Sequence, residues 1–236
     1  MAKTVLFLIP ISIWEPEKNA WITTDIKEAI VNSKGFFVEN ARTARRAIKK
    51  IEPNLNISEK IFIEFNKHEG WPEKEIKLNL SKEGNWGLIS EAGCPAVADP
   101  GEYIVRWAHQ LNVKVKALIG PNSILLALMA SGLNGQNFQF SAYLPIDKKE
   151  LNISLKNLEK ESQKQNKTQI FIETPYRSQD MLKTLINVLQ NSTLLCIASG
   201  INGPNEQILT KSISEWKKNK LDIQKVPTVF LFLAQS

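Results

Sequence analysis

The sequence has little that suits metal or disulfide chemistry, with two cysteines and two histidines in 236 residues. Cys94 and Cys196 lie far apart with no CxxC spacing, and His68 and His109 are the only other soft ligands. Zinc sites need about four such ligands, usually in closely spaced pairs. We therefore expect no metal site and no disulfide framework.

Long apolar runs are also missing. The apolar opening at residues 5–14 is shorter than the roughly 20 residues that span a bilayer, and Pro10 interrupts it. It has neither a basic region before it nor a small-residue cleavage site. We expect it to be a buried first strand, and we expect a cytoplasmic protein without a membrane contact.

No GxSxG sequence is present, which argues against a hydrolase with a nucleophile elbow. Hydrophobic residues make up 43% of the chain and charged residues 23%, proportions that are ordinary for a folded globular protein. The net charge of +6 is compatible with nucleic-acid contact. It does not establish such contact, because many basic proteins bind no nucleic acid.

Short apolar runs alternate with helical patterns along the chain, which predicts an α/β fold with a largely parallel sheet. The first group of predicted strands covers residues 4–9, 35–38, 60–65, 86–90 and 113–119. After Gly120 the pattern restarts, and further strands are expected at 138–143, 168–172, 193–198 and 229–233. We predict two α/β domains, at residues 1–119 and 120–236.

The segment SEAGCPAVADPG at residues 90–101 follows a predicted strand and precedes a predicted helix. Ligands of open α/β sheets bind where such loops leave the carboxyl ends of strands. An ordinary turn in which Asp99 caps the helix would have the same sequence features, since Asp is a favoured N-cap residue. The segment alone leaves both interpretations open.

This segment resembles the DAGTP-x-x-x-DPG motif of the ribosomal RNA small-subunit methyltransferase I family, within the tetrapyrrole methylase superfamily. Five more segments resemble family motifs in the same order. LIPIS at 8–12 is similar to VPTPIG, ENART at 39–43 to EDTR, GPNS at 120–123 to PGPSA, YLP at 143–145 to GFLP, and FIETPYR at 171–177 to FYE-x-P-x-R. Each motif is weak alone, whereas their order and spacing are specific.

The resemblance implies a tetrapyrrole methylase-like fold, in which two α/β domains hold S-adenosylmethionine in a cleft between them, usually in a homodimer. That fold has no GxGxG loop after its first strand, and none is present here. Carried over by position, the cofactor-binding residues are Ile13, Glu91, Cys94, Ser123, Ile124, Ile172, Ala198, Pro227 and Thr228. Ile172 and Ala198 lie in predicted strands and would be buried in any α/β protein.

The resemblance also implies 2′-O-methylation of a ribose in small-subunit ribosomal RNA, with the ribosomal RNA or the small ribosomal subunit as partner. Glu39 and Glu173, each at the end of a strand, are the candidate bases. Arg42 begins a predicted helix whose outer face carries Arg45, Arg46, Lys49 and Lys50. This face is either a phosphate-binding stripe or a solvated helix surface. Trp14, Trp21 and Trp71 either stack on bases or pack in the core.

Two other functions remain open at this point. The wider superfamily includes methylases of tetrapyrrole-type small molecules, and a basic site mouth would favour RNA over such a macrocycle. The chain also departs from the family pattern, with Glu91 in place of Asp, Cys94 in place of Thr, and ASG at 198–200 in place of ARE. These departures are compatible with a degenerate, non-catalytic binding module.

Overall fold

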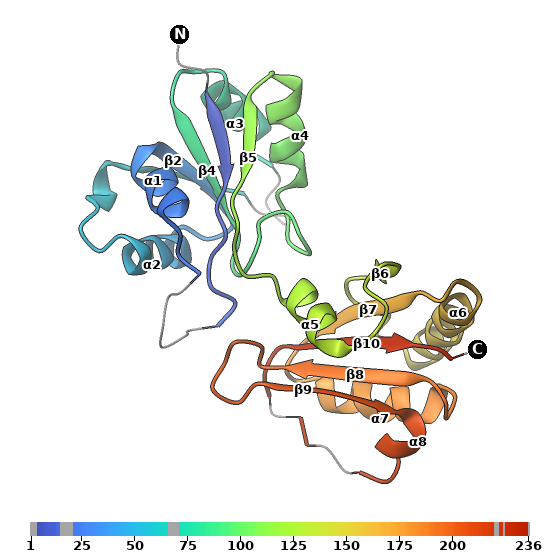
Figure 1. The fold of residues 1–236 in the computed structure, drawn as a ribbon. Helices are drawn as coiled ribbons and strands as arrows, with labels where there is room; N and C mark the ends of the chain where they lie inside the picture. Colours follow the sequence, from blue (N-terminus) through green and yellow to red (C-terminus); the bar gives the residue numbers. More distant parts are fainter. Residues whose placement is uncertain (1–3, 15–20, 66–70, 220–221, 224, 236) are drawn as a thin grey trace. The chain divides into compact units, whose positions relative to one another are not determined.

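The structure is a computed structural model that describes residues 4–14, 21–65, 71–219, 222–223 and 225–235 (Figure 1). The chain divides into two compact units, residues 1–122 and 123–236. The sequence predicted a division between residues 119 and 120. Each unit has its own sheet and its own hydrophobic core.

The first unit is built on a five-stranded sheet in the order β3-β2-β4-β1-β5, and every strand pair in it is parallel. The parallel arrangement predicted for this half is confirmed. Its strands are rich in apolar residues because parallel sheets are covered on both faces. They span β1 Val5–Leu8, β2 Ser33–Val38, β3 Ile61–Glu64, β4 Asn85–Ile89 and β5 Lys114–Ala117.

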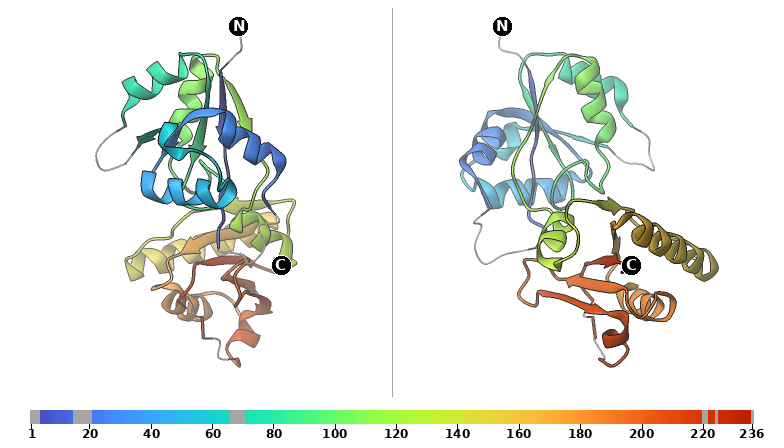
Figure 2. Two further views of the ribbon diagram at one scale, coloured as in Figure 1. Left: turned by 90° about the vertical axis from the view of Figure 1, so that its left-hand side faces the viewer. Right: turned by 45° about the vertical axis from the view of Figure 1, so that its right-hand side comes forward.

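Helices cover both faces of this sheet and make two separate cores (Figure 2). Alternating side chains of β2 divide between them, so that Phe36 and Val38 pack under α1 and α2 while Phe37 packs under α3 and α4. The helical elements are α1 Thr24–Asn32, α2 Ala41–Ile51, the 3₁₀ turn η1 Ile57–Glu59, α3 Glu73–Leu80 and α4 Glu102–Gln110. His109 is exposed on α4.

The second unit has a five-stranded sheet in the order β6-β7-β10-β8-β9. Only the β6–β7 pair is parallel, and the other three pairs are antiparallel. The parallel arrangement does not extend to this half. In the β8–β9 pair, for example, residues 200–206 form a short connection that returns the chain antiparallel. The strands are β6 Phe138–Phe140, β7 Thr168–Glu173, β8 Leu194–Ser199, β9 Gln207–Ser212 and β10 Thr228–Leu233.

Helices of the second unit also divide between the two faces of its sheet. The helices α6 and α7 bury Leu155 and Leu185 against Phe171 and Phe230. On the opposite face α5 crosses β8, β9 and β10 (Figure 1), where the Thr210 hydroxyl donates a 2.7 Å hydrogen bond to the Ser131 carbonyl. The helices are α5 Ser123–Ser131, α6 Lys148–Gln165, α7 Ser178–Val188 and α8 Ile213–Trp216.

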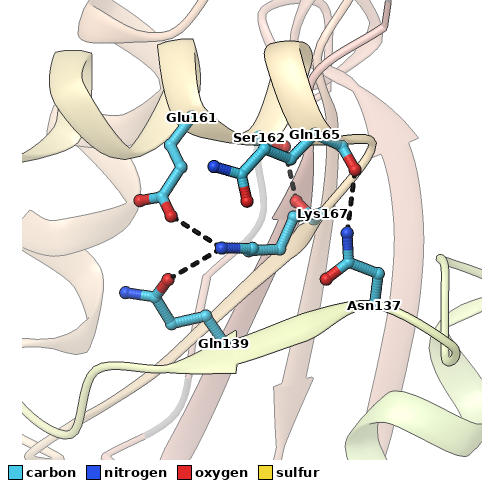
Figure 3. A network of polar contacts seen from close by, with 6 residues as sticks. All are labelled: Asn137, Gln139, Glu161, Ser162, Gln165 and Lys167. Atoms are coloured by element: carbon cyan, nitrogen blue, oxygen red, sulfur yellow. Dashed lines mark hydrogen bonds and ion pairs between the residues drawn. The ribbon is translucent and has the colours of Figure 1, made fainter.

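A polar network fastens the end of α6 to the edge of this sheet (Figure 3). Lys167 Nζ lies 2.6 Å from Glu161 Oε1 and donates to Gln139 Oε1 at 3.4 Å. Ser162 donates to the Lys167 carbonyl, and Asn137 donates to the Gln165 carbonyl. These contacts hold β6 in register with β7 although β6 has only three residues.

No helix within the described ranges is long and apolar enough to cross a membrane.

Candidate active site

Three neighbouring strands of the first unit end at one edge of its sheet. The strands β2, β4 and β1 are adjacent and parallel, so their carboxyl ends bring together the segments that begin at Glu39, Ser90 and Ile9. All three segments carry motifs that the sequence analysis singled out. The crevice beside such carboxyl ends is the usual ligand site of open α/β sheets.

The loop at residues 90–101 has an unusual backbone. Gly93, Ala96, Ala98 and Gly101 all have positive φ angles, of 69°, 64°, 65° and 137°. For alanine this conformation costs of order 1 kcal/mol and persists only where the surroundings impose it. The N-cap residue of α4 is Gly101 and not Asp99. Loops whose strained backbone is held by the surrounding structure are common at ligand sites.

A short bridge ties this loop to the segment after β1. The Ile11 N–H donates to the Gly93 carbonyl at 2.9 Å, and the Gly93 N–H donates to the Ile11 carbonyl at 3.2 Å. A Cβ at Gly93 would lie 3.1 Å from Cγ2 of Ile13. Glycine is therefore required here by both its φ angle and its close neighbour.

Glu39 joins the same loop from the end of β2. Its Oε1 accepts a 3.3 Å hydrogen bond from the Glu91 N–H. The next residue, Asn40, caps α2 by accepting from the N–H groups of Arg42 and Thr43. Glu64 at the end of β3 accepts from the Ala41 N–H at 2.6 Å. The sequence analysis missed the capping role of Asn40, although Asn before an amphipathic run is an ordinary N-cap signal.

Cys94 lies inside the first unit, where its thiol donates to the Pro121 carbonyl with an Sγ–O distance of 3.4 Å. Burial raises the pKa of this thiol above its ordinary value of 9.0, and a hydrogen bond with the Asn122 side chain opposes the rise. The thiol is therefore protonated at neutral pH. In this position Cys94 acts as a weak donor that holds the loop at residues 90–101 to the segment after β5.

A groove of about 820 Å³ opens beside these segments, wholly within the first unit. Two predicted cofactor residues, Ile13 and Glu91, line it. The sequence analysis did not assign the other polar and aromatic lining residues to a common site, because they come from three separate segments. These are Ser12, Trp14, Trp21, Thr43, Arg46 and Lys50. Arg42 is exposed in the first turn of α2, next to Thr43.

The predicted cofactor residues of the second unit converge on one end of its sheet. Ile172 and Ala198 both lie directly opposite Val229 of the central strand β10, so the three side chains share one face. Thr228 lies opposite Glu173 and Ser199, and its side chain therefore points to the other face. Ala198 is fully buried and Ile172 half-buried.

Three further predicted residues belong to the start of α5 and to the segment before β10. Ser123 and Ile124 begin α5, the helix that covers the face carrying Ala198, and Ile124 is buried. The Pro227 carbonyl accepts a 3.1 Å hydrogen bond from the Gly200 N–H, which fixes the turn that follows β8. Of the residues that depart from the family motif, Ala198 and Ser199 therefore lie at the end of β8, and Gly200, with φ 59°, begins the turn that follows.

Glu173, the second candidate base, has a different environment. Its carboxylate has no exposed surface, lies 3.1 Å from the Arg177 guanidinium and accepts a 2.7 Å hydrogen bond from the Thr174 N–H. These contacts hold the turn between β7 and α7. A carboxylate so enclosed is suited to fixing the backbone, and a role as base stays a prediction.

Two groups of predicted residues therefore form, Ile13, Glu39, Glu91 and Cys94 in the first unit and Ile172 and Ala198 in the second. Trp71 belongs to neither, because it stacks on Phe65 at 5.2 Å and packs against Trp107. Within the part of the chain that the structure describes, no group of three potential ligands is placed to hold a metal ion. His68 lies outside the described residues.

Comparison with known proteins finds several relatives that have the same name. No protein-family model matches the chain. It is 34% identical over 149 residues to ribosomal RNA small subunit methyltransferase I of Buchnera aphidicola, covering 63% of this chain and 51% of the relative. The protein of that name from Vibrio cholerae is 31% identical, covering 70% and 56%, and that from Bacillus subtilis 27%, covering 89% and 68%. The chain spans about half the length of the first of these relatives.

Solved structures with the same fold include a diphthine synthase and the uroporphyrin-III-C-methyltransferase of Thermus thermophilus. The diphthine synthase superposes with a TM-score of 0.67 at 16% identity, covering 98% of this chain and 90% of that one. The second structure gives a TM-score of 0.53 at 12% identity, covering 99% and 93%. At such low identity these similarities establish the fold alone.

Proposed function

Since the chain belongs to the ribosomal RNA small subunit methyltransferase I family and has a tetrapyrrole methylase-like fold, we propose that it transfers a methyl group from S-adenosylmethionine to a ribose 2′-hydroxyl of small-subunit ribosomal RNA. The activity stands as a proposal because the chain aligns with little more than half of its first relatives.

One observation supports this function above the others, namely the strained loop at residues 90–101. The Ile11–Gly93 bridge and Glu39 hold the start of this loop, and two alanines farther along it have positive φ angles. A solvated connection between a strand and a helix does not need such constraints. A binding loop does, because its amides must stay aimed at the ligand.

The residues of this loop and of the segment after β1 fit an adenosyl ligand. Ile13 and Ala92 offer small and aliphatic contacts, and the loop offers backbone amides and carbonyls in fixed orientations. We propose as cofactor-binding residues Ile13, Glu91 and Cys94 of the first unit and Ser123, Ile124, Ile172, Ala198, Pro227 and Thr228 of the second. When bound, S-adenosylmethionine supplies a methyl group on a sulfonium, which is already activated for transfer.

The protein then has to align the acceptor and help it lose a proton. A ribose hydroxyl is a weak nucleophile that gains from a base or from a cation beside the developing alkoxide. We assign Arg42, exposed at the start of α2, to the RNA phosphate or to the attacking oxygen. Glu39 positions the loop by accepting a hydrogen bond from the Glu91 N–H. Its alternative role is that of the base, and substitution of Glu39 distinguishes the two roles.

Two assays test the proposal. Calorimetry with S-adenosylhomocysteine measures cofactor binding, and labelled methyl transfer to small ribosomal subunits from cells that lack the protein measures activity. We expect binding and a single 2′-O-methylated nucleotide, located by mass spectrometry. Absence of binding at millimolar ligand would remove the cofactor assignment. Binding without transfer would favour a non-catalytic module, and transfer to a tetrapyrrole-type macrocycle in place of the subunits would favour the small-molecule function.

We also propose that the protein is a cytoplasmic homodimer, as its substrate and its family resemblance imply. The helix α5 supports a further apolar contact, because Met129 is 80% exposed on a helix with no charged residue. Sedimentation equilibrium should give twice the chain mass of 26.7 kDa. Met129→Glu should shift the equilibrium towards the monomer, and a monomeric wild type would overturn this proposal.

A further inference from the structure

Two of the proposed cofactor residues, Ile13 and Glu91, line the groove of the first unit, but its basic and aromatic lining residues are not assigned to the cofactor. Trp14 and Trp21 are its aromatic lining residues, and Arg46 and Lys50 of α2 contribute two positive charges against the single negative charge of Glu91. Its volume of about 820 Å³ lies within the range of about 300–1,000 Å³ that is typical of small-ligand sites. The groove can therefore accept a ligand of nucleotide size.

The basic residues of α2 fall into two sets with different contacts. Arg45 lies 4.4 Å from the centre of the Phe62 ring, and Lys49 donates to the carbonyls of Pro53 and Leu55. These two residues serve the fold of the first unit. Arg46 and Lys50 line the groove instead. Spaced four residues apart, with Arg42 one turn before them, they form a single row along the helix.

This row bears on the two alternatives for the basic face, a phosphate-binding stripe or a solvated helix surface. A solvated helix surface would not direct two cations into a groove beside the strained loop. The charge favours an anionic ligand over S-adenosylmethionine, whose sulfonium, ammonium and carboxylate sum to a net positive charge beside Arg46 and Lys50. An RNA phosphate is the anion that the proposed reaction brings to this edge of the sheet.

The tryptophans divide in the same way. Trp71 is part of an aromatic cluster with Phe65, Tyr103 and Trp107. Trp14 is half-buried at the groove, and Trp21 packs partly on the core beneath it. The indole N–H of Trp21 is buried with no acceptor among the described residues. A neighbouring ligand that brings an acceptor would satisfy this donor.

We propose that this groove binds one nucleotide of the RNA acceptor, with its base against Trp14 and Trp21 and its 5′ and 3′ phosphates on Arg46 and Lys50. The inference rests on the proposed function and names the part of the first unit that recognises the substrate. Thr43 also lines the groove, and its hydroxyl can donate to one of these phosphates or to the ribose.

The test compares two double variants of the full chain. Arg46→Gln/Lys50→Gln removes the two groove cations, whereas Lys74→Gln/Lys114→Gln removes two exposed cations elsewhere in the first unit. Binding of a fluorescein-labelled single-stranded RNA of about 12 nucleotides is followed by anisotropy over a range of salt concentrations. We expect the groove variant to lower the slope of log affinity against log salt by about 1.4, or about 0.7 for each lost phosphate contact, with the control unchanged.

The aromatic contact is tested separately. Trp14→Ala should weaken RNA binding about 5- to 150-fold through lost base stacking, whereas Tyr176→Ala, which removes an 83% exposed aromatic side chain from the second unit, should not. Circular dichroism checks the fold of each variant. Should the double groove variant misfold, Lys50→Gln alone gives half the change in slope.

Cofactor binding and methyl transfer separate this inference from the proposed function. Retained S-adenosylhomocysteine affinity with the lower salt slope supports the groove as a nucleotide site. A slope equal to that of wild type overturns it, even when the wild type methylates small subunits. Loss of S-adenosylhomocysteine binding with unchanged RNA binding also overturns it, because the groove would then hold the cofactor. A wild type that neither binds cofactor nor transfers methyl refutes the proposed function itself.

Discussion

The carboxylate of Glu39 accepts a hydrogen bond from the backbone N–H of Glu91 at 3.3 Å, which joins the end of β2 to the loop after the neighbouring strand β4. The residues are 52 positions apart in the sequence. Because that loop also bonds to Ile11 through Gly93, the segments after three adjacent strands are held together at one edge of the sheet. Glu39 is thus placed to act on the cofactor loop through its backbone.

Replacing Glu39 by Gln and by Ala distinguishes positioning from proton transfer. The Gln side chain keeps an oxygen that accepts the Glu91 N–H, so we expect S-adenosylhomocysteine affinity and methyl transfer within about threefold of wild type. Ala removes the acceptor, and affinity should fall by about 1 kcal/mol, or about fivefold. A Gln variant that binds cofactor normally but loses about 10²-fold or more in kcat would instead identify Glu39 as the base.

The pair between Glu173 and Arg177 should contribute mainly to stability. Arg177→Met leaves a fully buried carboxylate without its cation, and we expect a loss of about 2 kcal/mol in the free energy of unfolding. This value is below the roughly 3–5 kcal/mol of fully buried pairs, because Arg177 is itself 33% exposed. Urea denaturation measures the change. As a control, Lys183→Met breaks an exposed pair with Asp180 and should cost less than about 0.5 kcal/mol.

Cys94 offers a chemical probe of the cofactor site. Burial raises the pKa of its thiol above 9.0, so alkylation by iodoacetamide should be slow at pH 7 and accelerate as the pH rises through and beyond 9. Cys196 is fully buried in β8 and should react only after unfolding, which provides an internal control. S-adenosylhomocysteine at ten times its Kd should slow modification of Cys94 about tenfold. Unchanged modification with confirmed binding would place the ligand elsewhere.

The sequence predicted much of the first unit because its strands are short apolar runs and its helices have clear buried faces. Ala44 and Ile48 of α2, for example, repeat at helical spacing and are both buried. The strand β9 was missed because its sequence QILTKS is half polar and its side chains are half-exposed at the sheet edge. The turn residues Gly200, Asn202 and Gly203 before it are a hairpin signal that would have indicated an antiparallel pair.

The candidate site was predicted in its segments but not in its contacts. Motif resemblance led to Glu39, Glu91 and Cys94, whereas the groove depends on which face of α2 is turned towards the loop after β1. That orientation follows from tertiary packing, which also turned Arg45 and Lys49 away from the groove. For Gly93, the φ angle and the Ile13 contact show that Gly93→Val would strain the loop itself. It is therefore an unsuitable test of cofactor binding alone.

Arg42 separates the cofactor and RNA parts of the proposed site. Its backbone N–H is bonded to the Asn40 side chain whatever residue occupies the position, and its side chain is exposed, so Arg42→Ala should fold normally by circular dichroism. We expect S-adenosylmethionine affinity to change little, since Arg42 is not among the residues proposed to hold the cofactor. Methyl transfer to small subunits should fall by about 1–3 kcal/mol of transition-state binding.

The salt dependence of RNA binding gives the second readout for Arg42→Ala. If the guanidinium holds a phosphate, the variant releases fewer counterions and its salt slope is shallower by about 0.7. If it steadies the attacking oxygen, kcat falls while the slope stays as in wild type, because no phosphate contact has been lost. Unchanged kcat together with an unchanged slope would mean that Arg42 is a solvated surface residue, and loss of folding would assign it a structural role. Either of those two results removes Arg42 from the site.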